Sequence, residues 1–268
     1  MKREELDEDV SEKFLFEGPS GYGKSWLSAN IAKIYLIAGK KVLYIDPEKG
    51  MDKQKKKIFS NLTDEELDKI TLIKATNIDT YLKYMLGWTE TKQAGTQTVE
   101  FTHGNDYDLK VCDGITTEIE QYKTRLTQKF IKQGYYTIGE KNFSITNKDT
   151  FVLPYNFYGK LYDQIKEALV TMLDHNYDII ASMHLLKDTE GQRDLKESIY
   201  QKFDTIIKLN KITLSSGNPK WDATILKNRG RESPNSSNYV DDTNKFLKYF
   251  IKKFALDYDE VIKRFEYE

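Results

Sequence analysis

Short apolar runs alternate with amphipathic helical segments along most of the chain. The runs predict buried strands, at residues 13–17, 41–46, 70–75, 107–113, 177–184, 203–209 and 223–226. Apolar residues at helical spacing predict helices between them, at residues 27–38, 78–88, 116–132 and 158–172. This alternation favours a doubly wound α/β fold with a mostly parallel sheet and helices on both faces.

Two polar stretches and a separate C-terminal segment interrupt this pattern. Residues 1–240 are expected to form the core, with surface insertions at about 89–105 and 133–150. Residues 241–268 predict a helical tail that packs back on the core through four apolar side chains, Phe246, Phe250, Phe254 and Leu256. No internal repeat divides the chain further.

A glycine-rich segment between the first strand and the first helix matches the pattern G-x-x-x-x-G-K-[ST] in full. Its residues are Gly18, Pro19, Ser20, Gly21, Tyr22, Gly23, Lys24 and Ser25, followed by Trp26. In this position the backbone N–H groups and the helix N-terminus can bind a polyphosphate. Lys24 would contact the outer phosphates and the Ser25 hydroxyl would bind Mg²⁺. We therefore predict a site for ATP with Mg²⁺.

Magnesium at such a site also needs an acidic partner from the end of another buried strand. Asp113 follows the apolar run Leu109–Cys112 and is the predicted partner. Two alternatives are Asp46, which ends the strand at 41–46, and a role for Asp113 as the cap of the next helix. Cys112 itself is expected to be a small core residue.

Three classes of phosphate-loop protein lack their signatures in this chain. Clamp-loader-type ATPases carry Glu directly after the magnesium-binding Asp, where this chain has Gly114. Ras-type GTPases need Asn-Lys-x-Asp, which residues 147–150 miss by one position. Transporter ATPases need Leu-Ser-Gly-Gly-Gln, which residues 214–218 do not supply. These classes are set aside.

Residues 45–48, Ile-Asp-Pro-Glu, have the hydrophobic run and Asp-x-Glu order that follow the phosphate-loop helix in RecA-type ATPases. The chain resembles that family of recombinases, KaiC-like proteins and DnaB-type helicases, and most of all its members encoded by phages and archaeal viruses. The resemblance spans roughly residues 13–230. It implies a RecA-like P-loop NTPase fold in which Glu48 polarises the attacking water. The alternative for Glu48 is a surface position in a charged turn.

Two later segments also match the RecA type. Lys227 and Arg229 resemble the Lys-x-Arg pair that RecA-type helicases project into the nucleotide site of a neighbouring subunit, which implies a ring or filament of this chain. His184 ends the strand at 177–184, where the family keeps a polar sensor of the γ-phosphate. The alternatives are a solvated basic turn for the pair and a structural role for His184.

The resemblance directs two loops toward a path for single-stranded DNA. The first, residues 185–197, holds three cations and four acids and is a poor phosphate binder. The second, about 133–150, interleaves cations with aromatic rings, as single-strand binding surfaces do. These cations and aromatic residues are Lys132, Tyr135, Tyr136, Lys141, Phe143 and Lys148. An ordinary aromatic hairpin is the alternative.

Composition limits how such a protein can act. The 268 residues include 41 Lys and Arg against 42 Asp and Glu, which gives a net charge of −1. The overall charge therefore does not attract the protein to nucleic acid, and any contact with nucleic acid must be made by a local basic patch. No apolar run approaches the length of about 18 residues that a membrane helix needs, so we expect a cytoplasmic protein with no membrane partner. One cysteine and three scattered histidines argue against a disulfide framework and a zinc site.

Together these features predict a magnesium-dependent ATPase that works as an oligomer and acts on single-stranded DNA in recombination, annealing or replication. The predicted catalytic residues are Glu48, Lys24, Lys227, Arg229 and His184. One alternative is a P-loop kinase of a small molecule or nucleotide, with Lys227 and Arg229 acting in cis. Another is a nucleotide-gated regulatory or assembly subunit with little turnover.

Overall fold

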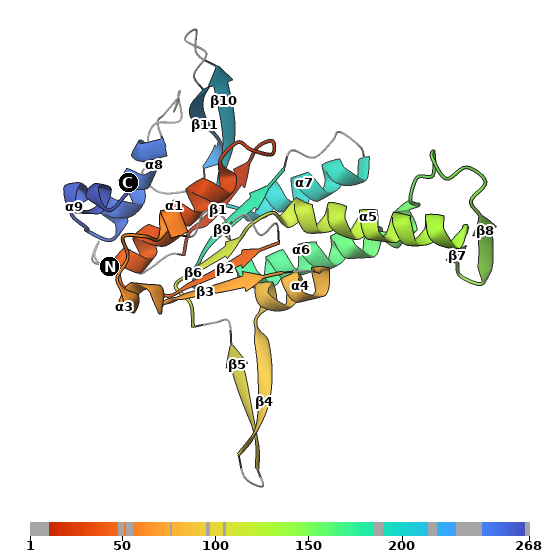
Figure 1. The fold of residues 1–268 in the computed structure, drawn as a ribbon, viewed down its shortest axis with the longest axis horizontal. Helices are drawn as coiled ribbons and strands as arrows, with labels where there is room; N and C mark the ends of the chain where they lie inside the picture. The colour runs from red at the N-terminus through yellow and green to blue at the C-terminus, as the bar shows by residue number, and fades with distance from the viewer. Residues whose placement is uncertain are drawn as a thin grey trace, which may run out of the picture.

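A seven-stranded sheet lies at the centre of the molecule (Figure 1). The computed structural model describes residues 11–47, 51, 56–75, 77–94, 97–103, 106–184, 190–213, 219–228 and 243–265. The strand order is β11-β10-β1-β9-β6-β2-β3, and every neighbouring pair is parallel except β10 and β11. The strands are β1 (Lys13–Glu17), β2 (Val42–Asp46), β3 (Ile70–Lys74), β6 (Leu109–Cys112), β9 (Asp178–Met183), β10 (Thr205–Thr213) and β11 (Pro219–Asn228).

Helices cover both faces of this sheet, which confirms the doubly wound α/β class. On one face pack α1 (Lys24–Ile37), α8 (Thr243–Lys253) and α9 (Tyr258–Lys263), and beside them lies the short α3 (Asp64–Leu67). On the other face pack α4 (Ile78–Leu86), α5 (Ile115–Gln133), α6 (Gly159–Leu173) and α7 (Glu190–Lys202). Among the described residues, no helix combines the length and apolar character that crossing a membrane requires.

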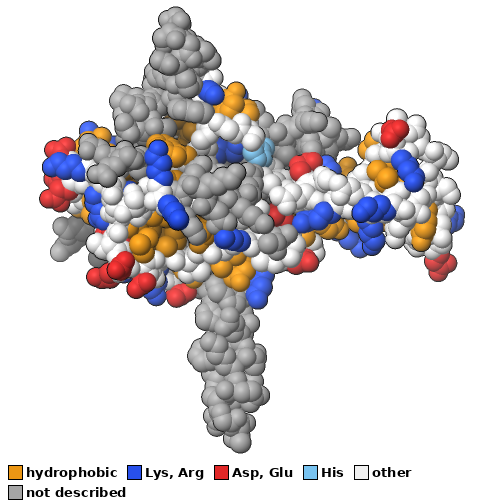
Figure 2. All heavy atoms as spheres, in the orientation of Figure 1, with side chains coloured by type: hydrophobic (Ala, Val, Ile, Leu, Met, Phe, Trp, Pro, Cys, Tyr) orange, Lys and Arg blue, Asp and Glu red, His pale blue; other side chains and the backbone are white. Residues whose placement is uncertain are grey.

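The β4–β5 hairpin (Trp88–Ala94 and Gln97–His103) and a longer segment that begins with α5 both extend away from the sheet (Figure 1). Helix α5 continues outward and leads to a hairpin of β7 (Tyr135–Ile138) and β8 (Lys141–Ser144) (Figures 1 and 2). The chain then returns through η2 (Tyr155–Phe157) to α6. We call residues 115–158 the arm.

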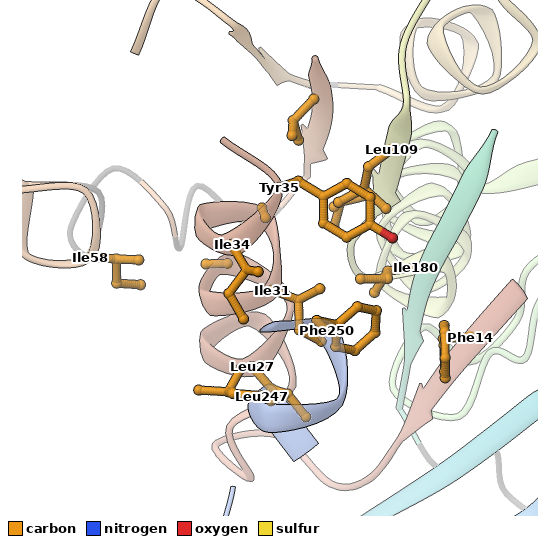
Figure 3. Packing of buried hydrophobic residues seen from close by; sticks show 14 of the residues in the cluster. Phe14, Leu27, Ile31, Ile34, Tyr35, Ile58, Leu109, Ile180, Leu247 and Phe250 are labelled. Atoms are coloured by element: carbon orange, nitrogen blue, oxygen red, sulfur yellow. The ribbon is translucent and has the colours of Figure 1, made fainter. Parts of the chain in front are cut away.

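The core beside α1 joins the C-terminal tail to the sheet. Figure 3 shows Leu27 and Ile31 of α1 close to Phe250 of α8, with Phe14 of β1 across from them. The ring of Phe250 lies 5.3 Å from that of Phe14 and 6.1 Å from that of Tyr35. Because these side chains are buried, α8 is held to the sheet by apolar contact.

A polar contact holds the same helix. Asp178, at the start of β9, accepts hydrogen bonds from the Tyr35 hydroxyl at 2.5 Å and from Lys253 Nζ at 2.6 Å. It also accepts one from the backbone amide of Glu12 at 2.6 Å. One carboxylate therefore connects α1, α8 and the residue before β1 with the sheet.

Two segments differ from the sequence-based expectation. The loop predicted over residues 185–197 is wrong from Glu190 onward, where α7 begins. This helix is rich in charged residues and has few apolar ones such as Ile199 to reveal its period. The helix predicted at 78–88 ends earlier because Gly87 adopts φ 93°, and the chain then forms a hairpin of β4 (Trp88–Ala94) and β5 (Gln97–His103).

Besides Lys24, three lysines among the described residues are buried, although lysine is seldom found inside proteins. Each amine donates to a backbone carbonyl: Lys13 to Tyr177 at 2.7 Å, Lys33 to Arg264 at 2.5 Å and Lys110 to Met85 at 3.0 Å. Burial lowers the pKa of each amine to about 8, because desolvation disfavours its charged form.

These pKa shifts predict that the protein gains stability between pH 8 and pH 9. In this window the unfolded chain keeps its lysines protonated, whereas the folded chain releases protons from the buried amines. The free energy of unfolding should therefore rise with pH by about 1 kcal/mol per buried lysine. Urea unfolding at the two pH values measures the rise. Lys110→Met should lower the rise by about 1 kcal/mol, and Lys252→Met, at an exposed position of α8, should leave it unchanged. An equal rise in Lys110→Met and the wild type would contradict the prediction.

Candidate nucleotide-binding site

Residues 18–23 form the loop between β1 and α1. Gly21 and Gly23 have φ values of 76° and 85°, a left-handed conformation that favours glycine. At Gly18, a Cβ atom would lie 2.8 Å from the carbonyl oxygen of Leu209 in β10. The loop thus requires glycine for its backbone conformation at two positions and for close approach to a strand at a third.

The first residue of α1, Lys24, turns its amine back into this loop. Its Nζ donates to the carbonyl oxygens of Gly18 at 2.8 Å and Pro19 at 2.9 Å, and lies 3.2 Å from Nδ1 of His184. Because an ammonium group can only donate, Nδ1 is the acceptor in this contact. Lys24 is buried, so its positive charge is held at the loop where the motif predicts the phosphates.

Asp113 follows β6 and is also buried. Its Oδ1 accepts a hydrogen bond from the Ser182 hydroxyl of β9, and its Oδ2 lies 3.2 Å from the hydroxyl of Tyr44 in β2. The N-cap of α5 is Gly114, and no side chain makes a capping hydrogen bond there. The interpretation of Asp113 as a helix cap is therefore wrong. Side chains of the two neighbouring strands hold its carboxylate instead.

Tyr44 connects this carboxylate with the first turn of α1. Its hydroxyl lies 3.2 Å from Asp113 Oδ2 and 3.3 Å from the carbonyl oxygen of Ser25, and can donate to either. Burial, and then the negative charge of Asp113, hold the pKa of Tyr44 well above its ordinary value, so the hydroxyl keeps its proton. Tyr44 thereby brings together the two residues predicted to bind Mg²⁺.

The oxygen atoms at this point suit magnesium. Mg²⁺ is usually held by one or two protein oxygens and completes its shell with water and phosphate oxygens. Asp113 offers a carboxylate and Ser25 a hydroxyl. Within the part of the chain that the structure describes, no group of three or more His, Cys, Asp or Glu could hold a metal ion. The residues present therefore fit an ion that binds together with a nucleotide.

The end of β2 lies beside Asp113 as well. Oδ2 of Asp46, the alternative magnesium partner, accepts a hydrogen bond from the amide of Met51 at 2.8 Å. Pro47 approaches Gly114 so closely that a Cβ atom at that glycine would lie 3.2 Å from Pro47 Cγ. Glu48, the predicted catalytic base, lies outside the described residues.

His184 lies between the loop and α5. Its ring contacts Lys24, and its backbone amide donates to the Thr116 hydroxyl in the first turn of α5 at 2.8 Å. One residue therefore touches both the phosphate loop and the helix that carries the arm.

Lys227 does not join this group. The strand registers place it near the level of Leu15, in the middle of β1 and before the loop begins. Its amine donates to the carbonyl oxygen of Tyr200 in the last turn of α7. Arg229 lies outside the described residues. The structure thus gives no support to Lys227 acting on the phosphate loop of its own chain.

Sequence reasoning does not identify Tyr44, Ser182 and Thr116. Tyr44 and Ser182 lie within apolar strands, and Thr116 lies in the first turn of a helix, so each has an ordinary structural explanation. For Tyr44 and Ser182, the one sequence feature that could have pointed to a site is a polar group inside an otherwise apolar run. Of the remaining predicted residues, Tyr22 in the loop and Trp26 in α1 are partly buried against the α1 core, and Ser20 is exposed.

Comparison with known proteins gives one family and several similar structures. The family model described as "Type III restriction enzyme, res subunit" matches residues 2–239. No curated protein matches the chain. Similar solved structures include the flagellar accessory protein FlaH from Methanocaldococcus jannaschii, the RadB recombinase and a KaiC-like protein from Pyrococcus horikoshii OT3. Their sequence identities are 15%, 14% and 14%, and their TM-scores 0.46, 0.46 and 0.45. The alignments cover 87%, 85% and 81% of this chain and 89%, 85% and 78% of theirs.

The contacts of Tyr44 predict a specific effect on magnesium. Tyr44→Phe should raise the magnesium concentration for half-maximal ATP binding by about tenfold, because one hydrogen bond to a charged group is lost. ATP binding measured across a magnesium titration tests this. Tyr81→Phe is the matched control, since this equally buried tyrosine donates to the backbone carbonyl of Asp113 at 3.1 Å and not to the carboxylate. Equal shifts in both variants would contradict the role of Tyr44.

Proposed function

The chain belongs to the Type III restriction enzyme, res subunit family, and on that premise we propose that it is a magnesium-dependent ATPase that acts on single-stranded DNA. It is a RecA-like P-loop NTPase. The observation that supports the proposal best is that Lys24 and His184 meet at the glycine-rich loop, while Tyr44 connects the buried carboxylate of Asp113 with Ser25.

Each of these residues has a defined task in phosphate transfer. Lys24 exchanges its carbonyl acceptors for phosphate oxygens and balances their charge. Ser25 and Asp113 would hold Mg²⁺, which would supply positive charge beside the phosphates. Glu48 orients the water for in-line attack. Its place in the sequence, directly after Pro47 at the Asp113 end of β2, supports this assignment.

His184 would report the state of the γ-phosphate. When Lys24 turns to the phosphates, the His184 ring loses its donor and can accept or donate elsewhere. Since the backbone of His184 is bonded to Thr116, this change would act on the first turn of α5.

Lys227 and Arg229 would act on the nucleotide of a neighbouring subunit. Lys227 lies near the level of Leu15, and its amine is hydrogen-bonded to α7. This position argues against action on the nucleotide of its own chain, which the kinase alternative would require. A cation supplied in trans makes hydrolysis depend on a ring or filament. The oligomer thus forms part of the proposed active site.

Removal of the Lys24 amine provides the direct test of the nucleotide site. Lys24→Ala should weaken ATP binding at least about tenfold, because charge-assisted hydrogen bonds to the phosphates are lost. Titration calorimetry with ATP and magnesium measures this, and circular dichroism checks the fold. Lys40→Ala removes a lysine just beyond the end of α1 and should bind ATP as the wild type does. Unaltered affinity in Lys24→Ala would exclude the site.

A mixing experiment tests action in trans. We expect ATP hydrolysis that single-stranded DNA stimulates, that rises more steeply than linearly with protein concentration, and that Arg229→Ala abolishes. Lys24→Ala, which keeps Arg229, should restore hydrolysis when mixed with Arg229→Ala, which keeps the phosphate loop. Failure of the mixture to exceed the sum of the two variants would exclude trans action. Consumption of ATP that only a small-molecule acceptor stimulates would favour the kinase.

A further inference from the structure

The arm carries a local positive charge on a nearly neutral protein. Residues 115–158 contain six Lys and Arg against four Asp and Glu, so the arm has a net charge of +2, whereas the whole chain has a net charge of −1. Figure 2 shows Lys and Arg side chains along this part of the molecule. The arm therefore meets the requirement that any contact with nucleic acid be a local patch.

Three of these cations form a row along α5. Arg125, Lys129 and Lys132 follow one another at intervals of four and three residues, so they share one side of the helix, and all three are exposed. The helix has 19 residues and is about 28 Å long, at 1.5 Å per residue. The row spans its outer half and ends beside the hairpin of β7 and β8. We call these three residues the cationic row.

The hairpin presents an aromatic ring next to a further cation. Phe143 pairs with Tyr136 across the hairpin, and their rings are stacked with centroids 5.3 Å apart and planes 11° apart. Phe130 and Phe157 support Tyr136 from behind. Phe143 is nevertheless 40% exposed. Lys141 is two residues away in the same strand and so lies on the same face.

The opposite face of the hairpin has a different character. It carries Tyr135, which is 43% exposed, together with Thr137, Asn142 and Ser144. No side chain on this face of the paired residues is charged. The two faces thus each offer an exposed ring, but only the Phe143 face combines the ring with a cation.

We propose that the Phe143 face and the cationic row together bind single-stranded DNA. The row attracts the phosphates, and one base stacks on the exposed ring of Phe143, which Tyr136 already holds in place. A purely apolar protein partner is a poorer fit, because Lys141 shares the face with the ring and lysine is depleted at the centres of protein interfaces. This inference rests on the proposed function, which it extends by locating the DNA site.

The position of α5 gives the proposed site a connection with the nucleotide. The helix begins two residues after Asp113, and its Thr116 hydroxyl accepts a hydrogen bond from the backbone amide of His184. A strand bound at the far end of this helix is therefore joined to the phosphate loop through one continuous element.

Binding of a fluorescein-labelled oligothymidylate to the full-length chain, measured by anisotropy, tests the proposal. Phe143→Ala should bind about tenfold more weakly, because a base loses its stacking partner. Tyr135→Ala is the matched control, with a similarly exposed ring on the other face, and should bind as the wild type does.

A second pair of variants tests the cationic row without touching the hairpin. The double variant Lys129→Gln with Lys132→Gln should make the negative slope of log affinity against log salt concentration less steep by about 1.4. This is about 0.7 for each phosphate that the protein no longer neutralises. Lys252→Gln with Lys263→Gln, at exposed positions of the C-terminal helices, should leave the slope unchanged.

The outcomes separate this inference from the function on which it rests. If the wild type hydrolyses ATP and binds DNA, but the Phe143 and row variants bind as well as it does, the arm is not the DNA site and the proposed function stands. Equal losses in Phe143→Ala and Tyr135→Ala would overturn the choice of face. If the wild type hydrolyses ATP but binds no DNA, both the arm site and the action on DNA are wrong. A change in oligomer mass in Phe143→Ala without loss of DNA binding would make the arm an interface between copies.

Discussion

The buried carboxylate of Asp113 is the contact on which the nucleotide site depends. A carboxylate removed from water is costly unless donors satisfy it, and here the donors are hydroxyls from the two neighbouring strands. Ser182 in β9 and Tyr44 in β2 reach it only in the observed strand order and register. The pairing of β9, β6 and β2 therefore stabilises the sheet and positions the predicted magnesium partner at the same time.

Other charges in the interior follow the same rule with different partners. Lys13, Lys33 and Lys110 donate to backbone carbonyls, and Lys24 does so at the phosphate loop. The first three stabilise the fold least when protonated, since their pKa is lowered. Lys24 differs because its acceptors lie in the loop that the sequence assigns to phosphate. Its charge is thus kept where a nucleotide would use it.

The proposed activities occupy different places in the molecule and are joined by single elements. Helix α5 begins at Ile115, two residues after Asp113, and leads to the hairpin of the arm. β11 carries Lys227 away from the phosphate loop of its own chain, toward the edge of the sheet. In the function proposed above, ATP would bind at the centre of the chain, DNA on its arm and a neighbouring subunit at the edge of the sheet.

Much of this could be predicted from the sequence, because it depends on local order. The phosphate loop is one continuous segment, and its glycines are needed for the local backbone conformation. The strands and most helices could be predicted from the spacing of apolar residues. Helix α7 escaped prediction because its mostly charged residues leave little apolar period. Tyr44 and Ser182 were not predicted as site residues, because their hydroxyls reach the Asp113 carboxylate only when β2 and β9 flank β6. The sequence placed cations and rings together in residues 132–148, but the pairing of β7 and β8 decided which ring shares a face with a lysine.

Local periodicity and motifs determined the fold class and the nucleotide loop. Contacts between distant segments, which no local pattern records, decided how the site around Asp113 and the face of the arm are composed.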